Sequence, residues 1–148
     1  MNVLEMLRFD HQSVDKIFHS IMLTSSSDKA KREELFGALK EALIKHAHAE
    51  EKVFYPPLRE KQQAHDIIEE GIHEHHSVED QLQKMSSIPA DSDDWLDAVQ
   101  HLKDSVQHHV QEEENEIFPK AEQLLGSQRL DQMGDEVEQA KQQEGPIH

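Results

Sequence analysis

The sequence predicts an all-α protein, an up-down-up-down four-helix bundle with a short extra C-terminal helix. Three observations favour this fold class. Glycine and proline are scarce, with five of each in 148 residues, and helix-forming residues such as Glu, Gln, Lys, Leu and Ala are common. Apolar residues recur at steps of three and four along four long segments. The turns between these segments are short, which favours near-antiparallel packing of consecutive helices.

Each of the four segments carries one apolar stripe at helical spacing. The first stripe runs over residues 4–21 and the second over residues 36–53. The third runs over residues 68–85 and the fourth over residues 95–117. A helix with one such stripe buries that face against neighbouring helices, so the four stripes together predict a common core.

The stripes are separated by residues that end or bend helices. A serine-rich turn that ends in Asp28 follows the first stripe, and Asp28 or one of the serines is expected to cap the second helix. The Pro56-Pro57 pair is expected to stop or kink that helix. Residues 88–93 form a turn that should also supply the capping residues of the fourth helix. That helix should kink at Pro119 and end near Gly126.

The chain length fits a single domain that covers residues 1–148. The four-helix bundle is expected over about residues 3–125, and the C-terminal helix and tail over residues 127–148. Within that last part, the amphipathic stretch of residues 128–142 should pack across one end of the bundle.

Composition and charge exclude several classes of function. The formal net charge of −16 opposes binding to nucleic acid or to an anionic membrane surface. The chain has no cysteine, which excludes disulfides, thiolate catalysis and cysteine-ligated metal clusters. No apolar run approaches the roughly 18 residues of a membrane span, and no secretory signal is visible. We therefore expect a cytoplasmic protein with neither a nucleic-acid nor a membrane partner.

One pattern of potential metal ligands is written twice in the chain. Residues 10–15, DHQSVD, are followed 64 positions later by residues 74–79, EHHSVE. Residues 46–56, HAHAEEKVFYP, are followed 63 positions later by residues 109–119, HVQEEENEIFP. Each half therefore contains a histidine and then a His-x-x-x-Glu pair, whose members lie on one face of a helix.

Six ionisable residues of this repeat fall on the stripes that should face the core. A buried carboxylate or imidazole without a partner costs several kcal/mol, so each must find a hydrogen bond, an ion pair or a metal. A single case would be read as an ordinary core histidine, but six in a repeated pattern indicate a two-metal site. The predicted metal ligands are His11, His46, Glu50, His75, His109 and Glu113.

Several neighbouring residues leave alternatives open. His48 and His108 adjoin predicted ligands but point off the stripes, so they are expected to be solvated. His73 or His76 could be a ligand in place of His75 if the helix phase were shifted, and the repeat alignment favours His75. Four acidic residues near the predicted ligands are expected at the surface or next to the ligands. Of these, Glu51 and Glu114 could also bind or bridge metal, and Asp15 and Glu79 could orient ligands.

The ligand chemistry restricts the metal. Imidazole and carboxylate without sulfur suit iron, and also manganese or zinc, better than copper(I). Three protein ligands per metal leave positions open for a small diatomic or anionic ligand such as dioxygen, nitric oxide or peroxide. The ferritin-like proteins use a Glu-x-x-His motif, so the His-x-x-x-Glu order here argues against that group.

The order of these residues resembles the hemerythrin-like, or HHE cation-binding, family. The resemblance spans about residues 3–125 and rests on His11 and His75 with the two His-x-x-x-Glu pairs, each followed by a proline. It implies a non-haem di-iron centre inside a four-helix bundle. His11, His46 and Glu50 would serve one iron and His75, His109 and Glu113 the other, with both glutamates bridging.

The sequence departs from the oxygen carriers of that family. Those proteins have a His-x-x-x-His pair on the third helix, whereas His75 is followed by Glu79 here. They also have an aspartate five residues after the last histidine, where this chain has Glu114. We therefore expect a protein that binds or reacts with a small oxidant. The alternative is an iron- or oxygen-sensing or iron-buffering module without turnover.

Overall fold

The computed structural model describes residues 1–145, and the end of the predicted tail, residues 146–148, lies outside the described residues. The all-helical prediction is confirmed, since no strand occurs in residues 1–145. Two of the nine elements in residues 1–145, labelled η, are short π-helices. In chain order they are α1 (Val3–Met22), α2 (Lys29–Ala49), η1 (Glu50–Phe54), α3 (Tyr55–Arg59), α4 (His65–Met85), α5 (Asp93–Glu112), η2 (Glu113–Ile117), α6 (Phe118–Leu125) and α7 (Ser127–Glu144).

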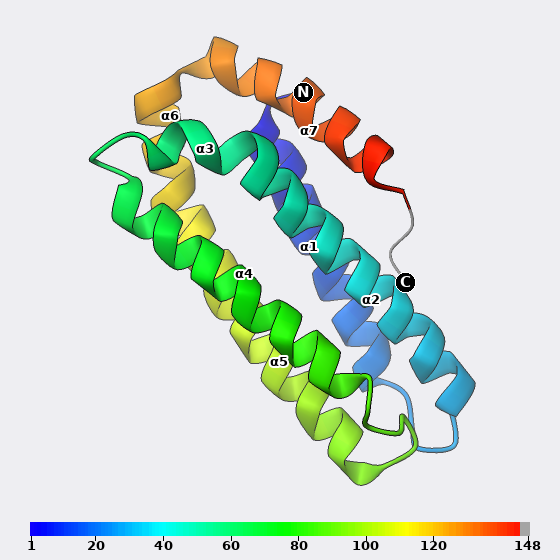
Figure 1. Cartoon of the computed structure of the whole chain (residues 1–148). Coiled ribbons are helices and arrows are strands. Elements are labelled where there is room, and N and C mark those ends of the chain that lie inside the picture. Colours follow the sequence, from blue (N-terminus) through cyan, green and yellow to red (C-terminus); the bar gives the residue numbers. More distant parts are fainter. Residues whose placement is uncertain (146–148) are drawn as a thin grey trace.

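The long helices lie side by side, and the last helix crosses one end of the molecule (Figure 1). Helix α1 packs on α2 and α4 packs on α5, and further contacts join α1 to α5 and α2 to α4. Helix α7 has 18 residues, slightly more than the stretch predicted from the sequence. It contacts α1, η1, α2 and α6, so it covers the end at which α3 and α6 lie. No helix in residues 1–145 has the length and apolarity needed to cross a membrane.

The two proline positions do not stop their helices. In both halves the α-helix changes to a π-helix of five residues and then continues as an α-helix. The backbone N–H of Tyr55 donates to the carbonyl of Glu50, and that of Phe118 donates to the carbonyl of Glu113. Because a proline lacks an N–H and crowds the carbonyl four residues earlier, the wider turn lets the chain pass Pro56 and Pro119 in helical form.

The predicted capping residues behave differently from the prediction. Asp28 stands at the N-cap of α2, but its side chain makes no capping hydrogen bond. Its carboxylate instead accepts from the backbone N–H of Ser25, 2.9 Å away, inside the preceding turn. Ser92 likewise precedes α5 and donates to the carbonyl of Pro89 at 2.8 Å. Both side chains therefore stabilise the turns and leave the first turns of the helices uncapped.

The far end of the molecule is held by a buried arginine that sequence reasoning did not single out. Arg32 is only 2% exposed. It donates to the hydroxyl and the carbonyl of Thr24 at 2.9 and 3.2 Å, and to the carbonyl of Ala90 at 2.7 Å. Its guanidinium also lies 5.3 Å from the ring centroid of Trp95. One side chain thus ties the α1–α2 turn to the α4–α5 turn.

The apolar core is divided into two clusters. One joins the start of α1 to η1, α3, α6 and α7 and includes Phe54, Leu58 and Phe118. The other joins the rest of α1 to α2, α4 and α5 and includes Phe18 and Trp95. The stripes of all four long segments change from apolar to ionisable residues between these clusters. The predicted metal ligands therefore lie between two apolar layers.

Candidate metal centre

The structure brings all six predicted ligands together in the interior. Glu50 and Glu113 have no exposed surface, and the four histidines are each 5–8% exposed. His11 comes from α1 and His75 from α4, whereas the other four come from the ends of α2 and α5 and the π-helices that follow. Their clustering supports the metal-ligand prediction made from the helical spacing.

The six residues form two groups that share both glutamates. In each group, one ligand atom from every residue lies within 4.8 Å of all the others. Both carboxylates therefore stand between two pairs of histidines, which is the position that a bridging ligand requires. The first group is His11, His46, Glu50 and Glu113, and the second is His75, His109, Glu50 and Glu113.

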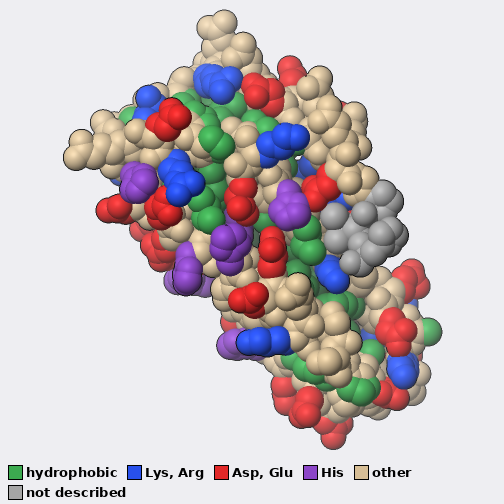
Figure 2. All heavy atoms as spheres, in the orientation of Figure 1, with side chains coloured by type: hydrophobic (Ala, Val, Ile, Leu, Met, Phe, Trp, Pro, Cys, Tyr) green, Lys and Arg blue, Asp and Glu red, His purple; other side chains and the backbone are tan. Residues whose placement is uncertain are grey.

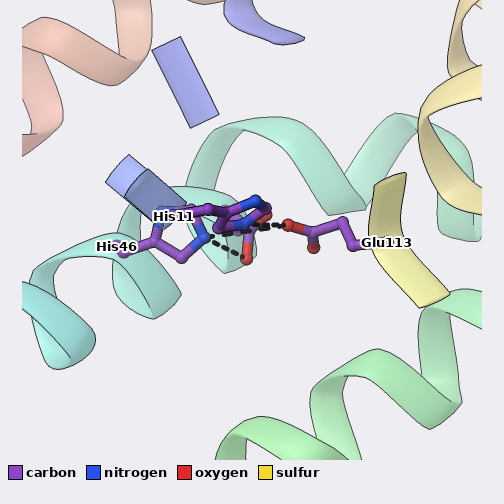
Figure 3. A group of neighbouring side chains, drawn as sticks. His11, His46 and Glu113 are labelled. Atoms are coloured by element: carbon purple, nitrogen blue, oxygen red, sulfur yellow. Dashed lines mark hydrogen bonds and ion pairs between the residues drawn. The ribbon is translucent and has the colours of Figure 1, made fainter. Parts of the chain in front are cut away.

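In the first group, the two imidazoles turn toward the glutamates from separate helices (Figure 3). The Nε2 atom of His11 lies 3.0 Å from Oε1 of Glu113. The Nε2 atom of His46 lies 3.2 Å from Oε1 of Glu50 and 3.7 Å from Oε1 of Glu113. In the second group, His75 Nε2 lies 3.0 Å from Glu50 Oε1, and Nε2 of the other histidine, His109, lies 3.6 Å from Glu113 Oε2.

These separations fit a metal ion. Two ligand atoms that are each about 2.1 Å from one ion lie about 3.0–3.4 Å apart at octahedral or tetrahedral angles. Within the described residues, three buried ligand atoms also have no hydrogen-bond partner: Nε2 of His46, Nε2 of His109 and Oε2 of Glu50. Unpaired buried polar atoms are costly, and coordination to a metal removes that cost. The donor set and its geometry therefore suit a pair of cations.

A carboxylate also lies at the opposite nitrogen of every imidazole. Because a carboxylate only accepts, each Nδ1–H donates to it and leaves Nε2 directed at the centre. We call these four acceptors the outer carboxylates. The pairs are His11 with Glu114 at 2.6 Å, His46 with Asp10 at 2.8 Å, His75 with Glu51 at 2.9 Å and His109 with Glu74 at 2.6 Å.

Two of the neighbouring acidic residues, Glu51 and Glu114, are outer carboxylates. Each contacts the Nδ1 atom of a ligand histidine, on the side of the ring that faces away from the shared glutamates. The expectation that Asp15 and Glu79 orient ligands is wrong, because neither makes a hydrogen bond to a ligand histidine. Asp15 is exposed, and Glu79 lies 3.6 Å from His48.

Two outer carboxylates, Asp10 and Glu74, were not singled out from the sequence. Each directly precedes a ligand histidine and contacts the histidine of the next long helix, His46 or His109. The repeat contained a usable signal, because an acidic residue occupies the same place in both halves. Knowing which histidine each of these acidic residues contacts, however, requires knowledge of how neighbouring helices pack.

The aromatic residues that follow the His-x-x-x-Glu pairs cover the centre on one side. Tyr55 stacks on the ring of His75 with 5.4 Å between centroids, and Phe118 stacks on His11 with 6.0 Å. These residues occupy equivalent positions in the repeat, yet only Tyr55 carries a hydroxyl. That hydroxyl donates to Glu113 Oε2 at 2.5 Å and lies 3.4 Å from Glu50 Oε1. It therefore contacts both glutamates.

Gly71 on α4 leaves room for this tyrosine. A Cβ atom at Gly71 would lie 3.1 Å from the hydroxyl oxygen of Tyr55, which is tighter than ordinary van der Waals contact. The absence of a side chain at this position lets the hydroxyl reach the two carboxylates. Neither Tyr55 nor Gly71 was singled out as a site residue from the sequence.

The histidines next to the ligands lie outside the centre. The side chain of His48 is 48% exposed and pairs with Glu144, whereas that of His108 is 66% exposed and lies 3.1 Å from Glu112. His76 is also exposed, which leaves His75 as the buried residue and supports the predicted helix phase. Figure 2 shows histidine and acidic side chains next to one another on the face over α2 and α4.

Charge within the metal-free centre is balanced by its own residues. Burial lowers the pKa of His75, but hydrogen bonds to Glu50 and Glu51 outweigh this effect and raise the pKa to about 9. Burial raises the pKa of Glu113, but hydrogen bonds with Glu50 and His11 hold it well below its usual value. In the metal-free chain, imidazolium groups therefore neutralise the carboxylates at neutral pH.

A small apolar cavity adjoins the four histidines. Its volume is about 40 Å³, enough for roughly two or three water-sized molecules. The ligand histidines form one wall and aliphatic side chains of the long helices form most of the rest. The aliphatic lining residues include Val14, Leu43, Val78, Leu82, Val106 and Val110, and Glu79 also lines the cavity.

Helix phase gives a paired test of the ligands. Replacing His46 by Ala should cause loss of bound metal, whereas His48→Ala should retain it, because only the first side chain faces the centre. The pair His109→Ala and His108→Ala should behave in the same way. Metal content of the purified variants, measured by elemental analysis, checks this. Equal loss from both members of a pair would show that the predicted phase is wrong.

The stability of chelator-treated protein should depend on pH in a defined direction. The pKa of His75 rises on folding, so its contribution is complete below about pH 6.5 and disappears as pH rises through about 9. The pKa of Glu113 falls on folding, so its contribution is present above about pH 4.5 and is lost in acid. Stability should therefore fall by up to about 3 kcal/mol between pH 6 and 9.

Denaturant unfolding at several pH values measures this dependence. Metal-loaded protein is the control, and it should not show the alkaline loss, because metal replaces the protons on the imidazoles. Chelator-treated protein that becomes more stable between pH 6 and 9 would contradict the charge balance described above.

Comparison with known proteins identifies the family. A family model described as the hemerythrin HHE cation binding domain matches residues 2–121. A crystal structure of a hemerythrin HHE cation binding domain-containing protein from Mycobacterium kansasii is similar in fold, with a TM-score of 0.86 and 24% identity. That likeness covers 97% of this chain and 86% of the other.

Two curated relatives are longer than this chain. A DNA nickase from Nostoc sp. is 32% identical over 141 residues, which cover 95% of this chain and 39% of the nickase. An uncharacterized hemerythrin-like protein from Schizosaccharomyces pombe is 27% identical over 134 residues, which cover 89% of this chain and 65% of that protein. Because the family model matches most of its length, this chain belongs to the hemerythrin HHE cation-binding domain family.

Proposed function

We propose that this chain holds two iron ions and binds or reacts with a small oxidant such as dioxygen, peroxide or nitric oxide. The observation that carries the proposal is the pair of His-His-Glu-Glu groups that share two fully buried glutamates. In this proposal the ligands are the six residues predicted from the sequence, held in a single domain with an up-down-up-down bundle and α7 as its extra helix. A cytoplasmic location is part of the same proposal.

Each group would hold one ion through two imidazoles, with Glu50 and Glu113 between the ions. Bound iron supplies one-electron redox chemistry and open coordination positions for a small ligand. Each outer carboxylate accepts the Nδ1–H of its histidine and so keeps Nε2 aimed at the centre, where a metal ion would take the place of a proton. The apolar layers on both sides limit the access of bulk water.

The cavity beside the histidines supports a diatomic or similarly small ligand. Its volume of about 40 Å³ and its aliphatic wall suit a small, weakly polar molecule better than a metabolite. On the other side of the centre, the Tyr55 hydroxyl donates to the glutamates and can hold a proton there. Tyr55 and the cavity therefore lie on different sides of the four imidazoles. A small ligand could enter through the cavity while the Tyr55 hydroxyl holds a proton on the other side.

A specific observation also favours the sensing or buffering alternative. The match to the nickase covers only 39% of that protein, so a domain of this kind can be one part of a longer chain. Such a domain could report bound iron or gas without turnover. DNA cleavage is not proposed for this chain, because the match is partial and a net charge of −16 opposes contact with a phosphate backbone.

Reaction with oxygen tests the proposal. Protein loaded anaerobically with ferrous iron should oxidise in air and should not recover its reduced absorbance when oxygen is removed. The reason is that Glu79 lines the cavity, where the resemblance to the oxygen carriers would place a fifth histidine. An acidic side chain offers one nitrogen ligand fewer and stabilises the oxidised metal.

Absorbance during cycles of oxygenation and deoxygenation gives the answer. Complete recovery of the reduced spectrum without added reductant would show reversible oxygen carriage. Repeated turnover with excess reductant and oxidant would favour a redox function, whereas one stoichiometric oxidation per centre would favour the sensing or buffering module. A chain that binds no iron would contradict both.

A further inference from the structure

The two halves of the centre differ in the charges around equivalent outer carboxylates. Asp10 and Glu74 occupy the same position in the repeat, and each accepts from the Nδ1–H of a ligand histidine. Asp10 also accepts from the ammonium group of Lys141, which belongs to α7 and lies outside the repeat. The Asp10 carboxylate is therefore shared between a cation and His46.

Glu74 lies in the opposite environment. Its Oε1 atom accepts from His109 at 2.6 Å, and its Oε2 atom lies 3.6 Å from Nε2 of His108. That imidazole also lies 3.1 Å from Glu112, so two carboxylates share one exposed histidine. Within residues 1–145, no Lys or Arg side chain forms an ion pair with Glu74. The second half therefore has an excess of negative charge where the first half has a lysine.

Helix α7 holds Lys141 at this position. The side chains of Asp10 and Lys141 are only 20% and 25% exposed, so water screens their pairing less than it would at an open surface. One turn further along α7, Glu144 pairs with His48 of α2. The end of α7 is thus fixed to α1 and α2, beside the His46 half of the centre.

This difference changes the strength of the histidine ligands. A carboxylate that accepts the Nδ1–H makes the imidazole a better electron donor at Nε2. An ammonium group on the same carboxylate withdraws part of that effect, because it competes for the negative charge. His46 is therefore the weaker donor and His109 the stronger. The surplus carboxylates near Glu74 further favour a cation in the second half.

We propose that Lys141 is a positioning residue that makes the two metal positions unequal. The ion between His75 and His109 binds more tightly and loads first, whereas the ion between His11 and His46 binds more weakly and leaves first. This inference rests on the proposed two-metal centre, and it adds an order of loading and a residue that sets it. The weakly held ion is then the one that exchanges with metal in solution.

Metal titration of the full chain, with ferrous iron added anaerobically, tests the inference through binding rather than activity. Native protein should bind two ions in two resolved steps. His109→Ala should remove the tighter step and His46→Ala the weaker step. Lys141→Met should tighten the weaker step on the order of tenfold, the lower end of the usual effect of changes behind ligand histidines, because Lys141 acts on His46 through Asp10. Lys141→Arg keeps the charge and should restore the native difference.

Two further variants separate this effect from general changes in charge or folding. Arg129→Met removes one positive charge from α7 at an exposed position that pairs with Glu136, and it should leave both steps unchanged. Glu112→Gln removes the second carboxylate that contacts His108 beside Glu74, and it should weaken the tighter step. This variant does not alter α7, so it tests the asymmetry even if Lys141→Met loosens that helix.

The outcomes distinguish the two proposals. Native protein that binds no metal would overturn the two-metal centre and this inference with it. Native protein that binds two ions, with steps unaffected by both Lys141→Met and Glu112→Gln, would overturn the inference and leave the two-metal centre standing. Equal effects of Lys141→Met and Arg129→Met would also overturn it, since net charge alone would then explain the change.

Discussion

The burial of six ionisable side chains between two apolar layers is the constraint on which the rest of the structure depends. Glu50 and Glu113 have no contact with solvent, and three ligand atoms around them lack hydrogen-bond partners. Such an arrangement is costly unless cations or protons compensate the carboxylates. The centre therefore determines both the stability of the helical interior and its chemistry. Without metal, imidazolium groups must balance the charge of the carboxylates.

The internal repeat explains how a short chain builds this centre. Each half contributes the same set of groups: a lone histidine, a His-x-x-x-Glu pair, a π-helix that begins at the glutamate, and an aromatic residue that stacks on a histidine of the other half. The halves then diverge at Tyr55, whose counterpart is Phe118, and at Asp10, whose carboxylate is paired with Lys141. Because of these differences, the two halves of a symmetric ligand set have different surroundings.

The ligands could be predicted from the sequence because helical spacing alone decides which residues face the core. The same spacing placed His48 and His108 outside, as observed. The carboxylates that hydrogen-bond to the ligand histidines were harder to predict from the sequence. Asp10 and Glu74 bond to histidines of neighbouring helices, so their role follows from packing rather than from spacing. The contact of Lys141 depends on how α7 docks, which a local pattern does not fix.

At the proline positions, too, the sequence predicted one part of the structure and not another. Pro56-Pro57 was expected to stop or kink the second helix and Pro119 to kink the fourth. Neither position stops its helix, because the wider π-turn tolerates the missing N–H. A sequence pattern locates such a proline but does not reveal how the preceding turn adapts. That adaptation has a functional consequence, since it occurs directly at Glu50 and Glu113, the residues that the two metal groups share.

Anomalous diffraction from crystals of iron-loaded protein can locate the metal ions themselves. We expect two peaks in the interior, one beside His11 and His46 and the other beside His75 and His109, with both glutamates between them. A single peak there, or metal found only at the partly exposed group of Glu74, His108 and Glu112, would contradict the two-metal centre.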